Sequence, residues 1–313
     1  MKKLLFGLIL LLSATVAALY FTPATQLTVL RWVEQYRAGL THEQLTVNDL
    51  NIHYYQGGPA SGETLILLHG FAADKDNWLR FSRHLTQDYR VIAVDLPGFG
   101  ESDLPPGSYD VGTQAERLAN ILDALGIRQA HVLGNSMGGH IAALFAARYP
   151  DRVHSLALFD NAGIDAPRQS ELYQRLRQDG ANPLVVRKIE DFQALLEFVF
   201  VEPPYLPESL KTHLAERAMA NAAHYDRVFE QLVSRYVPLE HELPKISAPT
   251  LILWGKQDRV LDVSSIEVMQ PLLRKPSVVI MDNVGHAPML ERPEESALLY
   301  RRFLADLKPE DIP

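Results

Sequence analysis

Segments of nearly continuous hydrophobic residues alternate with amphipathic segments along most of the chain after residue 45. Such unbroken apolar runs are typical of strands buried on both faces of a parallel sheet. They read TLILLHG, YRVIAVDLPG, AHVLGN, SLALFDNAG, TLILWG and SVVIMDN. Between them lie helical patterns such as TQAERLANILDALG, where Leu118, Ile121 and Leu122 share one face. The alternation predicts an α/β fold with an open, mostly parallel sheet and helices on both faces.

One long segment breaks this alternation. Residues 165–243 contain helical patterns and charged positions but no strand pattern. A segment of this length is too long for a connecting loop. We therefore predict a helical cap inserted into the sheet domain, which divides its core into residues 41–164 and residues 244–313.

Residues 1–23 begin with two lysines followed by 18 uncharged residues, Leu4 to Phe21. As a helix this run would span roughly 27 Å, close to the hydrocarbon thickness of a bilayer. A cleaved signal peptide, with small residues such as Ala17 at the cut, is one interpretation. We favour an uncleaved transmembrane anchor, because the apolar run continues to an aromatic pair suited to the membrane interface. Either interpretation leaves the lysines on the cytoplasmic side and the bulk of the protein across the membrane. With the anchor retained, we expect a single-pass membrane protein with its catalytic domain in the periplasm.

Residues 24–40 show an amphipathic helical pattern that follows the predicted anchor directly. Its apolar stripe comprises Val29, Trp32, Val33, Tyr36 and Leu40. The stripe fits a juxtamembrane helix that lies on lipid or pairs with a second copy, and it fits equally a helix packed on its own domain. A homodimer through residues 1–40 is a hypothesis that rests on this stripe alone.

Composition excludes several function classes. The formal net charge is −8 and no Lys/Arg-rich run occurs, so we expect no nucleic-acid partner. The absence of cysteine excludes disulfides and thiol catalysis. Neither an H-x-x-x-H pair nor a phosphate-binding glycine loop is present, so we expect no metal and no cofactor.

Ser136 is the candidate nucleophile. It lies at the centre of Gly134-Asn135-Ser136-Met137-Gly138, where an apolar run gives way to a helical pattern. A serine held in a strained strand-to-helix turn leaves no space for side chains two residues before and after it. The pentapeptide therefore predicts an exposed nucleophilic hydroxyl above the sheet.

A serine nucleophile also needs a base and an acid that orients the base. His286 follows the last predicted strand, where the base is expected. Asp258 lies a few residues after the preceding strand and is our choice for the acid. Asp160, at the end of an earlier strand, is the second choice, and Asp262 is a third candidate.

The oxyanion that forms during ester cleavage needs backbone N–H donors. We assign these to Met137, directly after the serine, and to Phe71, in the loop after the strand TLILLHG. His69 in that loop is interpreted as a residue that holds the turn, without a catalytic role.

The motifs HGF, DLPGFGESD, GNSMGG, WGKQDRVLD and GHAPMLERPEE occur in this order and resemble the α/β-hydrolase superfamily over most of residues 45–305. With the N-terminal anchor, the chain is similar to membrane-bound monoacylglycerol lipases and to bacterial lipases and phospholipase A-type enzymes. The resemblance implies a cofactor-free Ser–His–Asp hydrolase of acyl esters. Its catalytic roles fall on Ser136, Asp258 and His286, with Phe71 and Met137 as the oxyanion donors.

The cap segment EDFQALLEFVFVEPPYL suggests the substrate. An apolar cap over the serine suits an acyl chain, and a lipid ester is concentrated at the bilayer to which an anchored enzyme is bound. The candidate substrate-binding residues are Phe192, Leu196, Phe198, Phe200 and Tyr205. Two alternatives stay open. One is a carbon–carbon bond hydrolase, which usually has an aromatic residue where Ala287 stands, and the other is a slow-turnover ligand receptor on the same fold.

Overall fold

A computed structural model describes residues 2–180 and 182–308 of the 313-residue chain. Its centre is one eight-stranded sheet in the order β1-β2-β4-β3-β5-β6-β7-β8. The strands are β1 (Leu40–Val47), β2 (Leu50–Gly57), β3 (Thr64–Leu68), β4 (Arg90–Val94), β5 (Ala130–Asn135), β6 (Val153–Phe159), β7 (Thr250–Gly255) and β8 (Pro276–Met281).

Six of these strands coincide with the six apolar runs of the sequence. From β4 to β8 every neighbouring pair is parallel, and only β1–β2 and β2–β4 are antiparallel. The prediction of a mostly parallel sheet is therefore confirmed. The β1–β2 hairpin turns at Asn48 and Asp49, both with positive φ (48° and 66°), as a tight hairpin turn demands.

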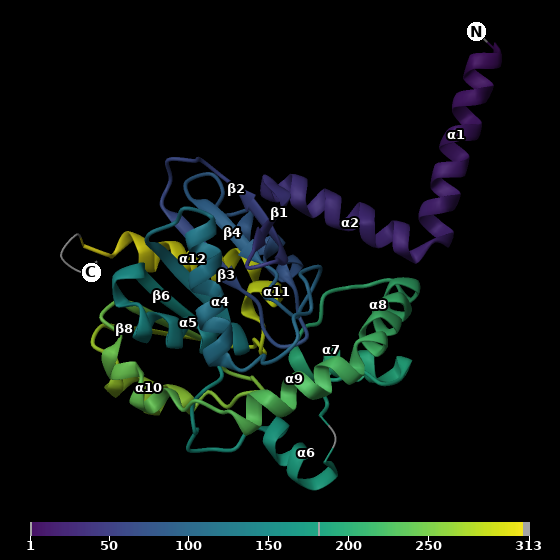
Figure 1. Cartoon of the computed structure of the whole chain (residues 1–313). Helices are drawn as coiled ribbons and strands as arrows, with labels where there is room; N and C mark the ends of the chain where they lie inside the picture. Colours follow the sequence, from purple (N-terminus) through teal and green to yellow (C-terminus); the bar gives the residue numbers. More distant parts are fainter. Residues whose placement is uncertain (1, 181, 309–313) are drawn as a thin grey trace.

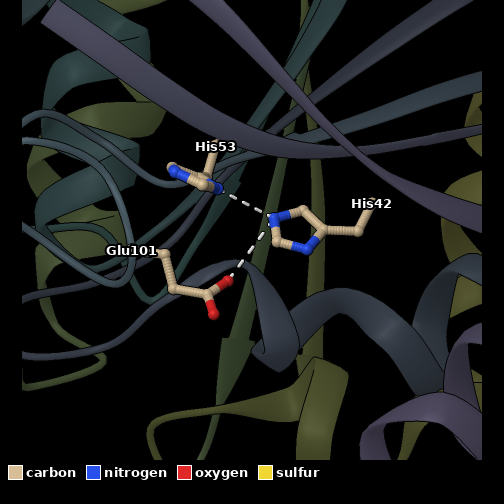
Figure 2. Close-up of side chains that lie close together, drawn as sticks. All are labelled: His42, His53 and Glu101. Atoms are coloured by element: carbon tan, nitrogen blue, oxygen red, sulfur yellow. Dashed lines mark hydrogen bonds and ion pairs between the residues drawn. The ribbon is translucent and has the colours of Figure 1, made fainter.

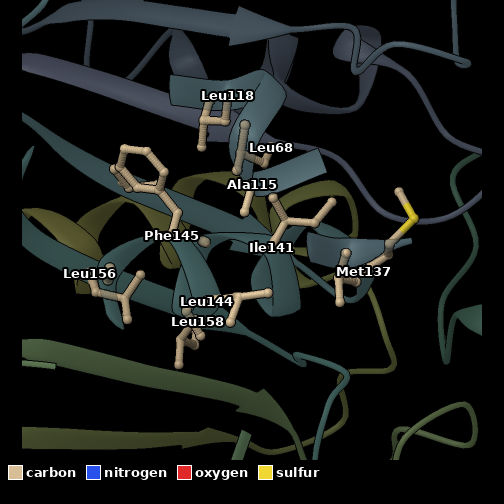
Figure 3. Packing of buried hydrophobic residues seen from close by; sticks show 14 of the residues in the cluster. Leu68, Ala115, Leu118, Met137, Ile141, Leu144, Phe145, Leu156 and Leu158 are labelled. Atoms are coloured by element: carbon tan, nitrogen blue, oxygen red, sulfur yellow. The ribbon is translucent and has the colours of Figure 1, made fainter. Parts of the chain in front are cut away.

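Helices cover both faces of the sheet and bury a separate apolar cluster on each (Figure 1). On one face, α4 (Val111–Ala124), α5 (Met137–Arg148) and α10 (Ser265–Leu272) contribute to the first cluster. Figure 3 shows Leu118 of α4, Leu68 of β3 and Ile141 of α5 in this one cluster. On the other face, α3 (Leu79–Ser82) and α12 (Pro293–Ala305) contribute to the second cluster, with α11 (Pro288–Glu291) beside them.

Four α-helices of the described chain lie between β6 and β7, in the segment predicted as a helical cap. They are α6 (Glu171–Asp179), α7 (Ile189–Val199), α8 (Glu208–Ala220) and α9 (Ala222–Ser234). They group on one side of the sheet domain (Figure 1). The described part of this segment contains no β-strand, in agreement with its sequence pattern.

The N-terminal helix α1 (Lys2–Phe21) projects away from the domain, whereas α2 (Pro23–Ala38) packs beside β1 and β2 (Figure 1). Large apolar side chains from Leu4 to Val16 of α1 are exposed. Within residues 2–180 and 182–308, no helix meets the length and hydropathy needed to cross a membrane alone. The helices Lys2–Ala18 and Pro23–Ala38 meet that requirement only as a pair, bent by 99°.

Two faces of α2 have different surroundings. Glu34 and Ala38 are buried against the domain, whereas Trp32 and Tyr36 are 64% and 78% exposed. The side chain of Gln35 donates a hydrogen bond to the Tyr55 hydroxyl on β2. Trp32 and Tyr36 of the predicted stripe therefore face away from the domain of this chain. The opposite face of α2, which includes Gln35, attaches the helix to that domain.

Candidate active site

Ser136 lies in the turn between β5 and α5, with φ 55° and ψ −120°. This left-handed conformation is unfavourable for a residue with a side chain. Backbone hydrogen bonds hold it in place: the Ser136 N–H donates to the Phe159 carbonyl, and the Ser136 carbonyl accepts from the His140 and Ala162 N–H groups, each at 3.0 Å. The strain falls on the residue that sequence analysis chose as the nucleophile.

The flanking glycines have the steric role expected of them. A Cβ on Gly134 would lie 2.2 Å from the Gly138 carbonyl oxygen, and a Cβ on Gly138 would lie 2.3 Å from the Leu68 carbonyl oxygen. Neither position can accept a side chain without displacing backbone. The turn therefore depends on both glycines, and their absence of side chains lets α5 approach β3 and β5 closely.

His286 is hydrogen-bonded to Asp258, with 2.8 Å between Nδ1 and Oδ2. The other oxygen of Asp258 accepts from the N–H groups of Val260 and Leu261, at 2.8 and 3.1 Å. These bonds hold the Asp258 carboxylate in place. Because Nδ1 of His286 faces this carboxylate, Nε2 of the same ring points away from it. The side-chain amide of Asn135 donates to the His286 carbonyl at 3.0 Å, so the histidine loop is attached to the residue just before Ser136.

Asp160, the second candidate for the acid, lies beside this pair and has a different role in the hydrogen-bond network. Its Oδ1 accepts from the Gly255 N–H at 2.8 Å, and its carboxyl lies within 4.8 Å of the ligand atoms of Asp258 and His286. Burial and the charge of Asp258 raise the pKa of Asp160 well above its usual value. Asp262, the third candidate, accepts from the Ser264 N–H and pairs with Arg168 instead. The structure thus brings His286 together with Asp258.

The loop after β3 places its backbone against the serine. A Cβ on Gly70 would lie 3.2 Å from the Ser136 Cβ. The buried His69 ring contacts the Gly70 carbonyl with Nδ1 (2.8 Å) and accepts from the Leu96 N–H with Nε2 (3.1 Å). Burial lowers the pKa of this imidazole, which favours the neutral ring that these two bonds require. His69 therefore holds the turn, as the sequence suggested.

The two candidate oxyanion donors are the N–H groups of Phe71 and Met137. Among residues 2–180 and 182–308, neither amide has a hydrogen-bond acceptor. Both belong to turns that meet at Ser136. Donors that are fixed in advance and have no internal partner are suited to stabilise a developing negative charge.

The loop after β3 contains part of a buried cluster of charged residues that sequence analysis did not select. Lys75, only 1% exposed, donates from Nζ to Asp95 at 2.7 Å and to Glu101 at 2.5 Å. Arg31 of α2 pairs with Asp76 in the same loop. The only signal was a lysine between two aspartates in FAADKDNW, which is also the pattern of an ordinary exposed loop.

The predicted substrate-binding residues occupy different environments. Leu196 and Phe200 are buried in the second cluster with Phe192 against it. Phe198 is buried beneath Arg175 and Arg259, whose guanidinium carbons lie 4.7 and 5.1 Å from the ring centroid. Tyr205 is 88% exposed.

Two aromatic residues of α9, Tyr225 and Phe229, contact Phe71 in the loop after β3. Their rings lie 5.7 and 5.6 Å from that of Phe71 in edge-to-face arrangements. Sequence analysis did not select them, although they lie four residues apart on an amphipathic helical pattern. They bring α9 and the Phe71 side chain together.

Comparison with known proteins agrees with this architecture. The family model of the alpha/beta hydrolase fold matches residues 63–293. Lipase 1 of Psychrobacter immobilis is 36% identical over 263 residues, covering 82% of this chain and 81% of that protein. Monoacylglycerol lipase abhd6-B of Xenopus laevis is 32% identical over 305 residues, covering 92% and 89%.

Among solved structures, the crystal structure of a membrane phospholipase A, described as a bacterial virulence factor, is similar to this one with a TM-score of 0.90. Its sequence is 60% identical, and the match covers 97% of this chain and 98% of that chain. These relatives place the protein among the carboxylic-ester hydrolases. The chain belongs to the α/β-hydrolase fold family.

Proposed function

We propose that the protein is a membrane-anchored serine hydrolase that cleaves acyl esters of lipids through an acyl-enzyme intermediate. The observation that carries the proposal is the 2.8 Å hydrogen bond between His286 and Asp258, in a loop attached to the strained turn of Ser136. The lipase, monoacylglycerol lipase and phospholipase A names of its relatives support a lipid substrate.

In the proposed reaction, Ser136 Oγ attacks the ester carbonyl carbon while Nε2 of His286 takes the hydroxyl proton. The N–H groups of Phe71 and Met137 hold the oxyanion, and Asp258 stabilises the imidazolium. The C–O bond to the alcohol then breaks, and His286 donates its proton to the leaving oxygen. A water molecule, deprotonated by His286, attacks the acyl-enzyme and releases the fatty acid, which restores Ser136.

Residues 1–23 act as the anchor in this proposal. The exposed apolar side chains of α1 follow Lys2 and Lys3, which suits a single-pass helix with its lysines in the cytoplasm and the catalytic domain in the periplasm. The name of the membrane phospholipase A supports membrane association. Trp32 and Tyr36 would then lie at the bilayer surface or against a second copy, and a detergent-solubilised protein that stays monomeric at all concentrations would remove the homodimer through residues 1–40.

We further propose that residues 165–243 form the acyl-chain cap between the two core segments, 41–164 and 244–313. The rings of Phe71, Tyr225 and Phe229 support an apolar wall next to the oxyanion loop. Phe200 lies beside the loop that carries His286. A Cβ built on Gly285 of that loop would be 3.1 Å from the Cα of Phe200. An apolar enclosure with few polar groups is suited to an acyl chain.

The test is fatty-acid release by the full-length protein in detergent, compared with the Ser136→Ala variant. The substrates are a short-chain ester, a monoacylglycerol, a lysophospholipid and a diacyl phospholipid. We expect release from the lipids that falls by roughly 10³-fold or more in the variant. Wild-type-like release by a folded Ser136→Ala protein would refute the mechanism. No release from any ester by the folded wild type would refute the lipid substrate and direct attention to carbon–carbon cleavage.

A further inference from the structure

Two histidines and one glutamate lie close together (Figure 2), and both histidines belong to the strands at the β1 end of the sheet. His42 belongs to β1 and His53 to β2, and the strand register pairs His42 with Tyr55 and His53 with Gln44. The two imidazoles are therefore diagonal neighbours on one face of the hairpin. Glu101 reaches them from the loop after β4.

The ligand atom of His42 lies at zinc-site spacing from those of both other residues. His42 Nε2 lies 3.0 Å from His53 Nδ1 and 3.4 Å from Glu101 Oε2. Bonds of about 2.0–2.1 Å at tetrahedral angles put neighbouring zinc ligands about 3.3 Å apart. A single proton shared by the two imidazoles accounts for the 3.0 Å contact in the metal-free protein. A cation can replace that proton if the three ligand atoms, which all lie within 4.8 Å of one another, close around it.

Lys75 binds the same oxygen of Glu101, Oε2, that faces His42. Lys75 holds the Glu101 carboxylate at 2.5 Å and is itself bound to Asp95 at 2.7 Å, so one buried cation faces two carboxylates. Partners that orient a metal-binding carboxylate in this way are a regular part of metal sites.

The site also leaves space for a fourth ligand. The side chains of His42 and Glu101 are 35% and 40% exposed, so water can reach the cation. The other group of potential ligands, Asp160, Asp258 and His286, is buried, and its histidine is engaged by Asp258. Of these two groups, the hairpin group alone is open to solvent.

We propose that His42, His53 and Glu101 bind a divalent transition-metal ion, with Zn²⁺ as the fitting ion and water as the fourth ligand. The ion joins β1, β2 and the loop after β4. Through Glu101 and Lys75 it also reinforces the charge cluster that supports the oxyanion loop. Its role is structural, and the ester chemistry at Ser136 does not require it.

The test measures Zn²⁺ binding to the full-length, tag-free protein in detergent by equilibrium dialysis, with Mg²⁺ as a comparison ion. We expect one tightly bound Zn²⁺ per chain, no competition by Mg²⁺, and a higher melting temperature with Zn²⁺. The single variants His42→Ala and His53→Ala should each weaken binding by ~10-fold or more, since each removes a direct ligand. His241→Ala, which alters an exposed histidine outside the cluster, is the matched control and should bind like the wild type.

Glu101→Gln keeps a side chain that can contact Lys75 but removes the negative charge, and it should also weaken Zn²⁺ binding. Circular dichroism establishes that each variant is folded before its affinity is compared. Wild-type affinity in both histidine variants, or an absence of tight binding in the wild type, would overturn the proposal. A loss of binding in His241→Ala equal to that in His42→Ala would also overturn it, because it would mark non-specific binding to surface histidines.

Discussion

Asp160 and Asp258 place their carboxyl groups together beneath His286, yet only Asp258 is hydrogen-bonded to the imidazole. Two buried carboxyls at this separation cannot both carry a full negative charge without a large electrostatic cost. Burial and the charge of Asp258 raise the pKa of Asp160, so the proton resides on Asp160. Asp160 is therefore the partner whose charge is disfavoured, and Asp258 is the one that contacts His286.

This arrangement predicts different outcomes for two matched substitutions. Asp258→Asn should lower kcat/KM by roughly 10³-fold or more, because it removes the charge that orients and stabilises the imidazolium. Asp160→Asn should retain activity within about tenfold, since an amide oxygen can still accept from the Gly255 N–H and the group is already neutral. Ester hydrolysis by the two purified variants checks this, and equal losses would mean that both carboxyls orient the histidine.

The close approach of α5 to β3 predicts that Gly138→Ala destabilises the protein. Its Cβ would lie 2.3 Å from the Leu68 carbonyl oxygen and 2.5 Å from that of His69, so backbone must move. We expect a loss of about 2–3 kcal/mol in the free energy of unfolding, together with a loss of activity. Gly126→Ala is the control: it has φ 68° and open space around it, so only about 1 kcal/mol of conformational strain is expected. Equal costs in urea unfolding would contradict the steric argument.

The contact between Phe71 and Phe229 predicts chain-length selectivity. Phe229→Ala should raise KM for a long-chain ester by about tenfold through lost apolar contact, with a much smaller effect on a short-chain ester. Val233→Ala, which changes an exposed residue of the same helix, should leave both values unchanged. A uniform fall in kcat for both substrates of Phe229→Ala would instead assign this ring to the support of the oxyanion loop.

The raised pKa of Asp74 predicts that the stability of the protein depends on pH. Burial and the charges of Asp76 and Asp95 raise the pKa of Asp74 from 3.8 to about 7. Between these values the folded chain keeps a proton that the unfolded chain has released, so this group makes the folded state less stable as pH rises. Asp74→Asn should therefore gain stability over the wild type as pH increases from 4 to 8. Urea unfolding across this range measures the gain, with Asp282→Asn as an exposed control; a constant difference would exclude the effect.

The sequence predicted the parts of the molecule whose physical cause is local. Buried parallel strands must be apolar along their whole length, so β3 to β8 were visible as runs of hydrophobic residues. The turn at Ser136 was visible because Gly134 and Gly138 have no acceptable substitute. The Asp258–His286 contact was expected from the order of the motifs, although three aspartates competed for the role.

Features that depend on contacts between distant segments were not visible. β1 is an edge strand with mostly exposed side chains, so it has no apolar alternation to detect. Lys75 is recognisable as buried only once Asp95 and Glu101 lie around it. The same is true of His42 and His53, because strand pairing brings them together and their spacing along the chain resembles no metal motif.

The His286 backbone has a consequence for how substrate can enter. Its N–H donates to the Val199 carbonyl at the end of α7, at 2.8 Å, and its carbonyl accepts from Asn135. The end of α7 is thereby fastened to the loop that carries His286, and a movement that lifted it would displace this histidine. In the proposed enzyme the edge at this end of α7 is the attached side of the cap, and we expect a lipid to enter at another part of its rim.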